Sequence, residues 1–202
     1  MSLEELIRND ITDKNTTHSY IPLYQKLLEG KKETAKNVLE IGIYNGGSIK
    51  LWSEFFTNAT IYGLDIMCIE DIWCETMKEN IDNCETMKEN IDNKNIKLYT
   101  SYDAYDENTF KLNFLCKGIK FDFMLDDGPH TLESMEMFIK LYSQIMTDDG
   151  ILIIEDVQDY KWIDILKLAV PDNLQKYIKV YDLRQNKGRY DDIVFTIDKS
   201  NN

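Results

Sequence analysis

The chain has few of the residues that build metal-stapled or disulfide-rich proteins. Its 202 residues include only 4 cysteines, 2 histidines and 3 prolines. The cysteines form no CxxC pair, and two of them lie in a duplicated segment, so the sequence indicates neither a zinc site nor a disulfide framework. We expect reduced, structurally incidental thiols at Cys68, Cys74, Cys84 and Cys116.

An excess of basic charge is also missing. Lys and Arg number 23 against 36 Asp and Glu, which gives a net charge of −13. The electrostatic field of this negative charge repels phosphate backbones and anionic lipid headgroups. The charge therefore argues against nucleic acid and membrane surfaces as partners. No apolar run approaches the ~20 residues of a bilayer span, and the first ten residues lack the order of a secretion signal. We expect a soluble cytoplasmic protein.

Hydrophobic runs of strand length alternate with longer amphipathic stretches through the middle of the chain. The runs are residues 37–41, 60–64, 96–99, 121–125 and 151–154. Between them lie helical patterns, such as residues 132–145, where apolar residues recur every three or four positions. Strands joined by helices are parallel neighbours in a sheet covered on both faces. This order predicts a doubly wound, Rossmann-like α/β fold.

The carboxyl end follows another pattern. Residues 177–183 and 192–197 are strand-like and are separated by a short polar stretch that contains Asn186 and Gly188. This spacing favours an antiparallel hairpin over a helical crossover. The prediction is a mostly parallel sheet of seven strands with an antiparallel C-terminal hairpin strand.

The length suits one domain, which we expect to be a single domain over residues 1–202. Residues 1–30 are expected to form a helical cap of two short helices, interrupted around residues 12–17. Residues 74–93 are a perfect tandem repeat of CETMKENIDN. The main interpretation of this duplicated decapeptide is an amphipathic surface helix without a catalytic role, and the alternative is a lid or partner-contact element.

Acidic residues end nearly every predicted strand. They are Glu40, Asp65, Asp103, Asp126, Asp127, Glu155 and Asp156. Ligands of open parallel sheets bind outside the carboxyl ends of the strands, so these carboxylates are expected to converge and to require a cation. A single acid such as Asp127 would instead be explained as a helix N-cap. The two acid pairs, Asp126–Asp127 and Glu155–Asp156, favour a site for Mg²⁺ or Mn²⁺.

A glycine-rich turn, Gly42-Ile43-Tyr44-Asn45-Gly46-Gly47-Ser48, follows the first predicted strand. Its glycines allow a close approach of the backbone to a ligand, although the spacing is not that of the dinucleotide GxGxxG motif. Asp65, at the end of the second strand, would hold ribose hydroxyls. Glu40, within the first strand, suits a cofactor that carries an ammonium group. The combination indicates a nucleoside-type cofactor.

The two histidines are candidates for contact with substrate. His130 lies three residues after Asp127, and the intervening Gly-Pro turn favours a general base near the carboxylates over a helix-capping role. His18, with Lys14 and Tyr20, lies in an amino-terminal segment that would fold over the site. These three residues are candidates for substrate or cofactor contact.

The segments VLEIGIYNGGS, YGLDI, FDFMLDDGPH, ILIIEDV and DLRQNKGRYDDIVF resemble the class I S-adenosylmethionine-dependent methyltransferases. More narrowly, they are similar to the metal-dependent sugar O-methyltransferases that act on macrolide deoxysugars and rhamnosyl groups. The resemblance begins near residue 12, at TDKNTTHSYIPLY, and ends near residue 198. The most specific part is DDGxH followed by a strand that ends in Glu-Asp.

Carried over by position, the resemblance implies a role for each matching residue. The metal ligands would be Asp127, Glu155 and Asp156, with His130 as general base and Asp127 beside it in catalysis. The S-adenosylmethionine contacts would be Glu40, Gly42, Tyr44, Asn45, Gly46, Ser48, Asp65, Asp103 and Asp126. Two departures are Ala104, where relatives often have a polar residue, and the duplicated decapeptide.

The implied activity is S-adenosylmethionine- and Mg²⁺-dependent O-methylation of a sugar that has vicinal hydroxyls, such as rhamnose or another 6-deoxysugar. The acceptor would be free, nucleotide-linked or part of a glycan, and a homodimer would fit the small class I enzymes. One alternative is a catechol-type O-methyltransferase with the same metal logic. The other is a binding protein that keeps the cofactor fold without catalysis.

Overall fold

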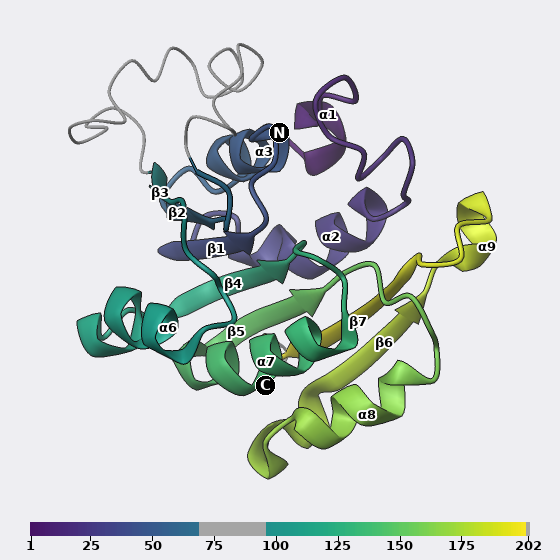
Figure 1. The fold of residues 1–202 in the computed structure, drawn as a ribbon. Coiled ribbons are helices and arrows are strands. Elements are labelled where there is room, and N and C mark those ends of the chain that lie inside the picture. Colours follow the sequence, from purple (N-terminus) through teal and green to yellow (C-terminus); the bar gives the residue numbers. More distant parts are fainter. Residues whose placement is uncertain (69–95, 201–202) are drawn as a thin grey trace. The chain divides into compact units, whose positions relative to one another are not determined.

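The computed structural model describes residues 1–68 and 96–200, which divide into two compact units, Met1–Tyr102 and Asp103–Asn202. The predicted surface helix over the duplicated decapeptide lies outside the described residues. Figure 1 shows the elements of both units. Among the described residues, no helix is both long enough and apolar enough to cross a membrane.

The first unit has three parallel strands and the helices that pack with them. Its elements are α1 (Leu3–Leu6), α2 (Ile21–Leu28), a short 3-10 helix (Glu29–Lys31), β1 (Asn37–Ile41), α3 (Gly47–Phe55), β2 (Thr60–Leu64) and β3 (Ile96–Tyr99). The strand order is β3-β2-β1, with Val38 opposite Ile61 and Ile61 opposite Ile96. The last four residues of β1 and of β2 are buried, as their continuous hydrophobic sequence predicts for parallel strands.

The second unit begins with α6 (Glu107–Asn113) and continues through a mixed set of strands and helices. The further elements are β4 (Phe121–Asp126), α7 (Leu132–Tyr142), β5 (Met146–Ile154), α8 (Trp162–Ala169), β6 (Ile178–Asp182), α9 (Arg184–Lys187) and β7 (Ile193–Asp198), with 3-10 turns at Leu115–Lys117, Ser143–Ile145 and Asp172–Tyr177. The strand order is β4-β5-β7-β6. β4 pairs with β5 in parallel, whereas β7 is antiparallel to both β5 and β6.

These elements confirm the predicted fold class. The described strands number seven, most pairings follow the parallel pattern, and the C-terminal hairpin is antiparallel. One strand starts earlier than predicted: β5 begins at Met146 rather than at Ile151. The register of β4 and β5 shifts from Phe121–Met146 to Phe123–Ile151, so an irregularity accommodates the extra polar residues.

Helix α7 begins with a capping box that fixes the chain directly after the DDGPH motif. The Thr131 hydroxyl accepts a hydrogen bond from the Ser134 N–H, and the Ser134 hydroxyl accepts one from the Thr131 N–H. The buried side of the helix carries Met135, Phe138 and Ile139, at helical spacing. Because Thr131 is the N-cap, neither Asp127 nor His130 caps this helix. The helix-capping roles that the sequence left open for these two residues are therefore excluded.

Candidate functional site

In the first unit, Asp65 organises the turn that follows β1. Its Oδ2 accepts hydrogen bonds from the N–H groups of Ile43, at 2.7 Å, and Tyr44, at 3.4 Å. Gly42, Tyr44 and Gly46 have φ values of 88°, 44° and 73°, all in the left-handed region. Glycine adopts this backbone readily and tyrosine rarely does, so the carboxylate of Asp65 stabilises an unusual turn. The glycine-rich turn and Asp65, both predicted to contact the cofactor, are therefore joined by hydrogen bonds in the structure.

Within the same turn, the side chains predicted to contact the cofactor differ in exposure. Tyr44 is 77% exposed and Asn45 is half-buried, whereas Ser48 is buried in the first turn of α3. Gly47 lies so close to the carbonyl of Ile11 that a Cβ could not be accommodated there. The packing of the amino-terminal segment on this turn accounts for that glycine.

Glu40 is fully buried and has a cationic neighbour within its own unit. Its Oε2 accepts a hydrogen bond from Trp52 Nε1 at 3.1 Å, and its Oε1 lies 3.7 Å from Lys14 Nζ. Lys14 is also buried, with 1% of its surface exposed. The structure thus brings together two residues that the sequence analysis assigned to different roles. Lys14 supplies the positive charge that a buried carboxylate requires.

His18 and Tyr20 belong to an aromatic stack within the amino-terminal segment. The His18 and Tyr20 rings are stacked with centroids 4.9 Å apart, and Tyr24 continues the row at 5.8 Å from Tyr20. His18 Nε2 also lies 3.7 Å from Asp13 Oδ2. Tyr20 is completely buried, which gives it a packing role in the structure. A role for these residues in substrate contact stays a prediction.

In the second unit, Asp126 lies at the end of β4 and is held by a residue that the sequence analysis missed. Tyr105 donates its hydroxyl hydrogen to Asp126 Oδ1 at 2.5 Å. Burial raises the pKa of Asp126 to about 7, against the lowering effect of the Tyr105 hydrogen bond. The N–H of Tyr105 donates to Asp103 Oδ1 at 2.9 Å. Neighbouring Ala104 is buried, and its carbonyl accepts a hydrogen bond from the Tyr142 hydroxyl at 2.8 Å.

The carboxylates of Asp127 and Asp156 meet at His130. Each of these three residues offers one ligand atom, and the three atoms lie within 4.8 Å of one another. His130 Nε2 is 3.7 Å from Asp127 Oδ1 and 3.6 Å from Asp156 Oδ2. The structure therefore assembles three of the four residues predicted for the metal and the general base.

Backbone conformation sets this group apart. His130 and Asp156 have φ values of 54° and 57°, in the left-handed region that non-glycine residues seldom occupy. Each such residue costs about 1–3 kcal/mol and is typical of functional sites. The surrounding structure must hold both side chains in place against this cost. We infer that the left-handed backbone at His130 and Asp156 serves to position their side chains in the site.

Glu155 is the predicted metal ligand that lies apart from this group. It is buried, and its N–H donates to the carbonyl of Asp126 at 3.3 Å, which ties the end of β5 to the end of β4. Among the described residues, it belongs to neither of the two His and carboxylate groups that could hold a metal. Its role as a metal ligand stays a prediction.

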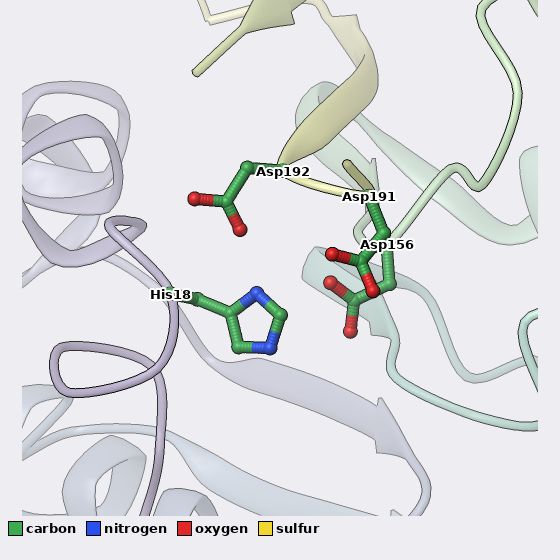
Figure 2. A group of neighbouring side chains, drawn as sticks. All are labelled: His18, Asp156, Asp191 and Asp192. Carbon is green, nitrogen blue, oxygen red and sulfur yellow. The ribbon is translucent and has the colours of Figure 1, made fainter. Parts of the chain in front are cut away.

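Asp191 and Asp192 are acidic neighbours of Asp156 that the sequence analysis did not single out. Their carboxylates offer oxygen atoms within 4.8 Å of that of Asp156. Figure 2 shows the carboxyl groups of Asp156 and Asp191 next to each other, with Asp192 nearby. The signal was present in the sequence, because RYDDIVF holds a third pair of adjacent acids at one end of a strand-like run.

The donor atoms of the second unit fit a hard divalent cation. Carboxylate oxygens predominate, and Mg²⁺ and Mn²⁺ prefer such ligands, with water and substrate oxygens completing their coordination. Several carboxylates brought together in a partly buried place also need positive charge to offset their repulsion. The residues therefore match the metal predicted from the sequence.

Comparisons with known proteins agree with the fold. No family model matches the chain. It is 29% identical over 152 residues to an uncharacterized protein of Acanthamoeba polyphaga mimivirus, covering 73% of this chain and 63% of that protein. It is 25% identical over 168 residues to the mycinamicin VI 2''-O-methyltransferase of Micromonospora griseorubida, covering 79% of this chain and 37% of the enzyme.

A solved structure shows the same architecture. The MycE methyltransferase from the mycinamycin biosynthetic pathway, in complex with Mg, SAH and mycinamycin VI, aligns with a TM-score of 0.69 and 20% identity, over 98% of this chain and 53% of that chain. The chain therefore has the Rossmann-like α/β fold of the class I methyltransferases, and the predicted resemblance to sugar O-methyltransferases is confirmed. In each of these three matches, the chain spans less than two thirds of the length of the matched protein.

Proposed function

We propose that the chain is an O-methyltransferase that uses S-adenosylmethionine and Mg²⁺ to methylate a hydroxyl of a sugar with vicinal hydroxyls. The observation that carries this proposal is the meeting of Asp127, His130 and Asp156 after two strands of a methyltransferase fold, with His130 and Asp156 on left-handed backbone. The likeness to a mycinamicin-pathway methyltransferase, in sequence and in structure, supports the sugar hydroxyl as acceptor. The proposal treats both units as one catalytic domain, as expected from the sequence.

The first unit supplies the residues proposed to bind the cofactor. Asp65 and the turn of residues 42–46 offer a carboxylate and a closely approachable backbone for a nucleoside. Glu40 provides a buried negative charge suited to an ammonium group. In the structure this carboxylate also forms an ion pair with Lys14. S-adenosylmethionine would supply an electrophilic methyl group on a sulfonium.

The second unit supplies the residues proposed for proton transfer. A divalent cation held by Asp127 and Asp156 would lower the pKa of a nearby sugar hydroxyl. His130 accepts the proton that the hydroxyl loses as its oxygen attacks the methyl carbon and the carbon–sulfur bond breaks. The imidazolium that forms is stabilised by Asp127 and Asp156, whose oxygens lie 3.7 and 3.6 Å from Nε2.

The test is formation of S-adenosylhomocysteine by the full chain with Mg²⁺ and a panel of acceptors. The panel should contain rhamnosides, nucleotide-linked 6-deoxysugars and catechols. Turnover on a sugar, its loss in EDTA and its return with added Mg²⁺ are the expected results. Asp156→Asn should abolish turnover, whereas the matched control Asp148→Asn, on an exposed carboxylate, should leave it unchanged. Turnover on catechols alone, or full activity in metal-free protein, would contradict the proposal.

A further inference from the structure

The antiparallel strand β7 brings an acid pair to the end of the second unit's sheet where β5 ends. β5 and β7 run in opposite directions, with Ile154 opposite Phe195. The N–H of Val157 then donates to the carbonyl of Ile193 at 3.1 Å, so the pairing continues beyond the strand. The residues before β7 therefore lie beside the residues after β5.

Three carboxylates from these two segments face one another. Asp156, Asp191 and Asp192 each offer an oxygen within 4.8 Å of the other two. Their exposed fractions are only 8%, 7% and 0%. Burial of like charges at this separation is unfavourable without a compensating cation, and the small exposed surface favours a compact ion over a bulky organic one.

A second observation concerns the bonding of Asp191. Its Oδ2 accepts a hydrogen bond from Arg189 Nη2 at 2.9 Å. Its Oδ1 is buried and has no hydrogen-bond partner among the described residues. A buried carboxylate oxygen normally has a partner, so Oδ1 has the position and chemistry of a free metal ligand. The Arg189 side chain that pairs with Asp191 Oδ2 is itself 40% exposed.

We propose that Asp156, Asp191 and Asp192 bind a second divalent cation of the Mg²⁺ or Mn²⁺ class. Asp156 also belongs to the group with Asp127 and His130, so the two cation sites would share its carboxylate. Hard oxygen ligands on a preformed backbone suit these ions. The second site depends on the proposed function in one respect only: the proposed function places the neighbouring cation at Asp127. Two cations close together are a common arrangement for fixing adjacent oxygen atoms of a substrate.

The test is the number of Mn²⁺ ions bound per chain, measured by the loss of the free-ion electron paramagnetic resonance signal. The full chain should bind two. The pair Asp191→Asn and Asp192→Asn should bind one, and Asp127→Asn should also bind one. The matched control is Asp148→Asn with Asp149→Asn, an exposed acid pair in the early part of β5, which should still bind two. Circular dichroism establishes that each variant is folded.

A single Mn²⁺ per wild-type chain would overturn the second site, whether or not the Asp191 and Asp192 variant retained it. If that variant does not fold, the wild-type count decides alone. Two ions combined with no methyl transfer on any acceptor would refute the proposed function and leave the second site standing. One ion combined with turnover on a sugar would refute the second site and leave the proposed function standing.

Discussion

Tyr105 donates its hydroxyl hydrogen to Asp126 Oδ1 at 2.5 Å and lies against Gly128 so closely that a Cβ there would collide with the hydroxyl. These three residues form one contact between the start of the second unit and the DDGPH motif. Asp127 lies between Asp126 and Gly128 in the sequence, and His130 comes two residues after Gly128. We therefore infer that Tyr105 positions the backbone that carries both.

Tyr105→Phe is expected to lower the free energy of unfolding by about 1.5–3 kcal/mol, because the buried Asp126 carboxylate loses the hydrogen bond that the Tyr105 hydroxyl donates. The measurement is urea denaturation at pH 8, above the pKa of Asp126 of about 7. Tyr102→Phe, at a 44% exposed ring, is the control and should change stability little. Equal stability of the Tyr105 variant and the wild type would remove the positioning role.

Gly128→Ala is expected to lower the free energy of unfolding by about 1–3 kcal/mol through overpacking against the Tyr105 hydroxyl. The effect should be smaller in a Tyr105→Phe background, since the atom in closest conflict is gone. A double-mutant cycle measures this coupling. Gly30→Ala is the control, because a Cβ there meets nothing within 4 Å. Strictly additive losses would contradict the contact.

Lys14→Met is expected to destabilise the chain by about 3–5 kcal/mol, because a buried carboxylate at Glu40 loses its cation. Adding Glu40→Gln to this variant should recover much of the loss, since no buried charge then remains to be compensated. Thermal and urea unfolding of both variants check the prediction. A double variant no more stable than Lys14→Met would show that the two charges are not coupled.

His130→Asn is expected to reduce kcat for methyl transfer by about 10²–10⁴-fold, the usual contribution of a general base. Asparagine tolerates the left-handed backbone at this position, so the change tests the imidazole rather than the fold. Calorimetric affinity for S-adenosylmethionine should stay unchanged. An unaltered kcat would exclude proton transfer by this residue.

Lys179→Met is expected to lower the free energy of unfolding by about 1 kcal/mol at neutral pH, since one partner of the pair is largely exposed and solvent-screened. Burial alone would raise the pKa of Asp198, but hydrogen bonds from Lys179 and Ser200 outweigh it and hold that pKa below its usual range. A lowered pKa stabilises the folded state above about pH 4, and this contribution is lost as the pH falls further. Unfolding curves of both proteins should therefore converge in acid, and a constant difference would contradict the pairing.

The sequence predicted most strands because buried parallel strands are continuous hydrophobic runs. β1, β2 and β3 have the predicted bounds. The start of β5 was missed because its polar residues, including Asp148 and Asp149, have no strand pattern and enter through a register shift. Local pattern does not reveal how such an irregularity is accommodated.

The candidate site was predictable where it depends on the carboxyl ends of parallel strands. Asp127 and Asp156 fit that rule, and the structure brings them together at His130. The rule did not predict Asp191 and Asp192, because they precede a strand. Only the antiparallel direction of β7 brings them to the end of the sheet where β5 ends. Tyr105 was missed for another reason, since its contact with Asp126 joins residues far apart in the sequence.

The left-handed backbone at Tyr44, His130 and Asp156 restricts which substitutions these positions accept. Branched residues such as valine or isoleucine would be strained at these three positions, whereas asparagine and glycine would be tolerated. A mutagenesis library that randomised these codons fully would therefore include many destabilised variants. Substitutions are better directed to exposed neighbouring residues, with the residues of these three turns left unchanged.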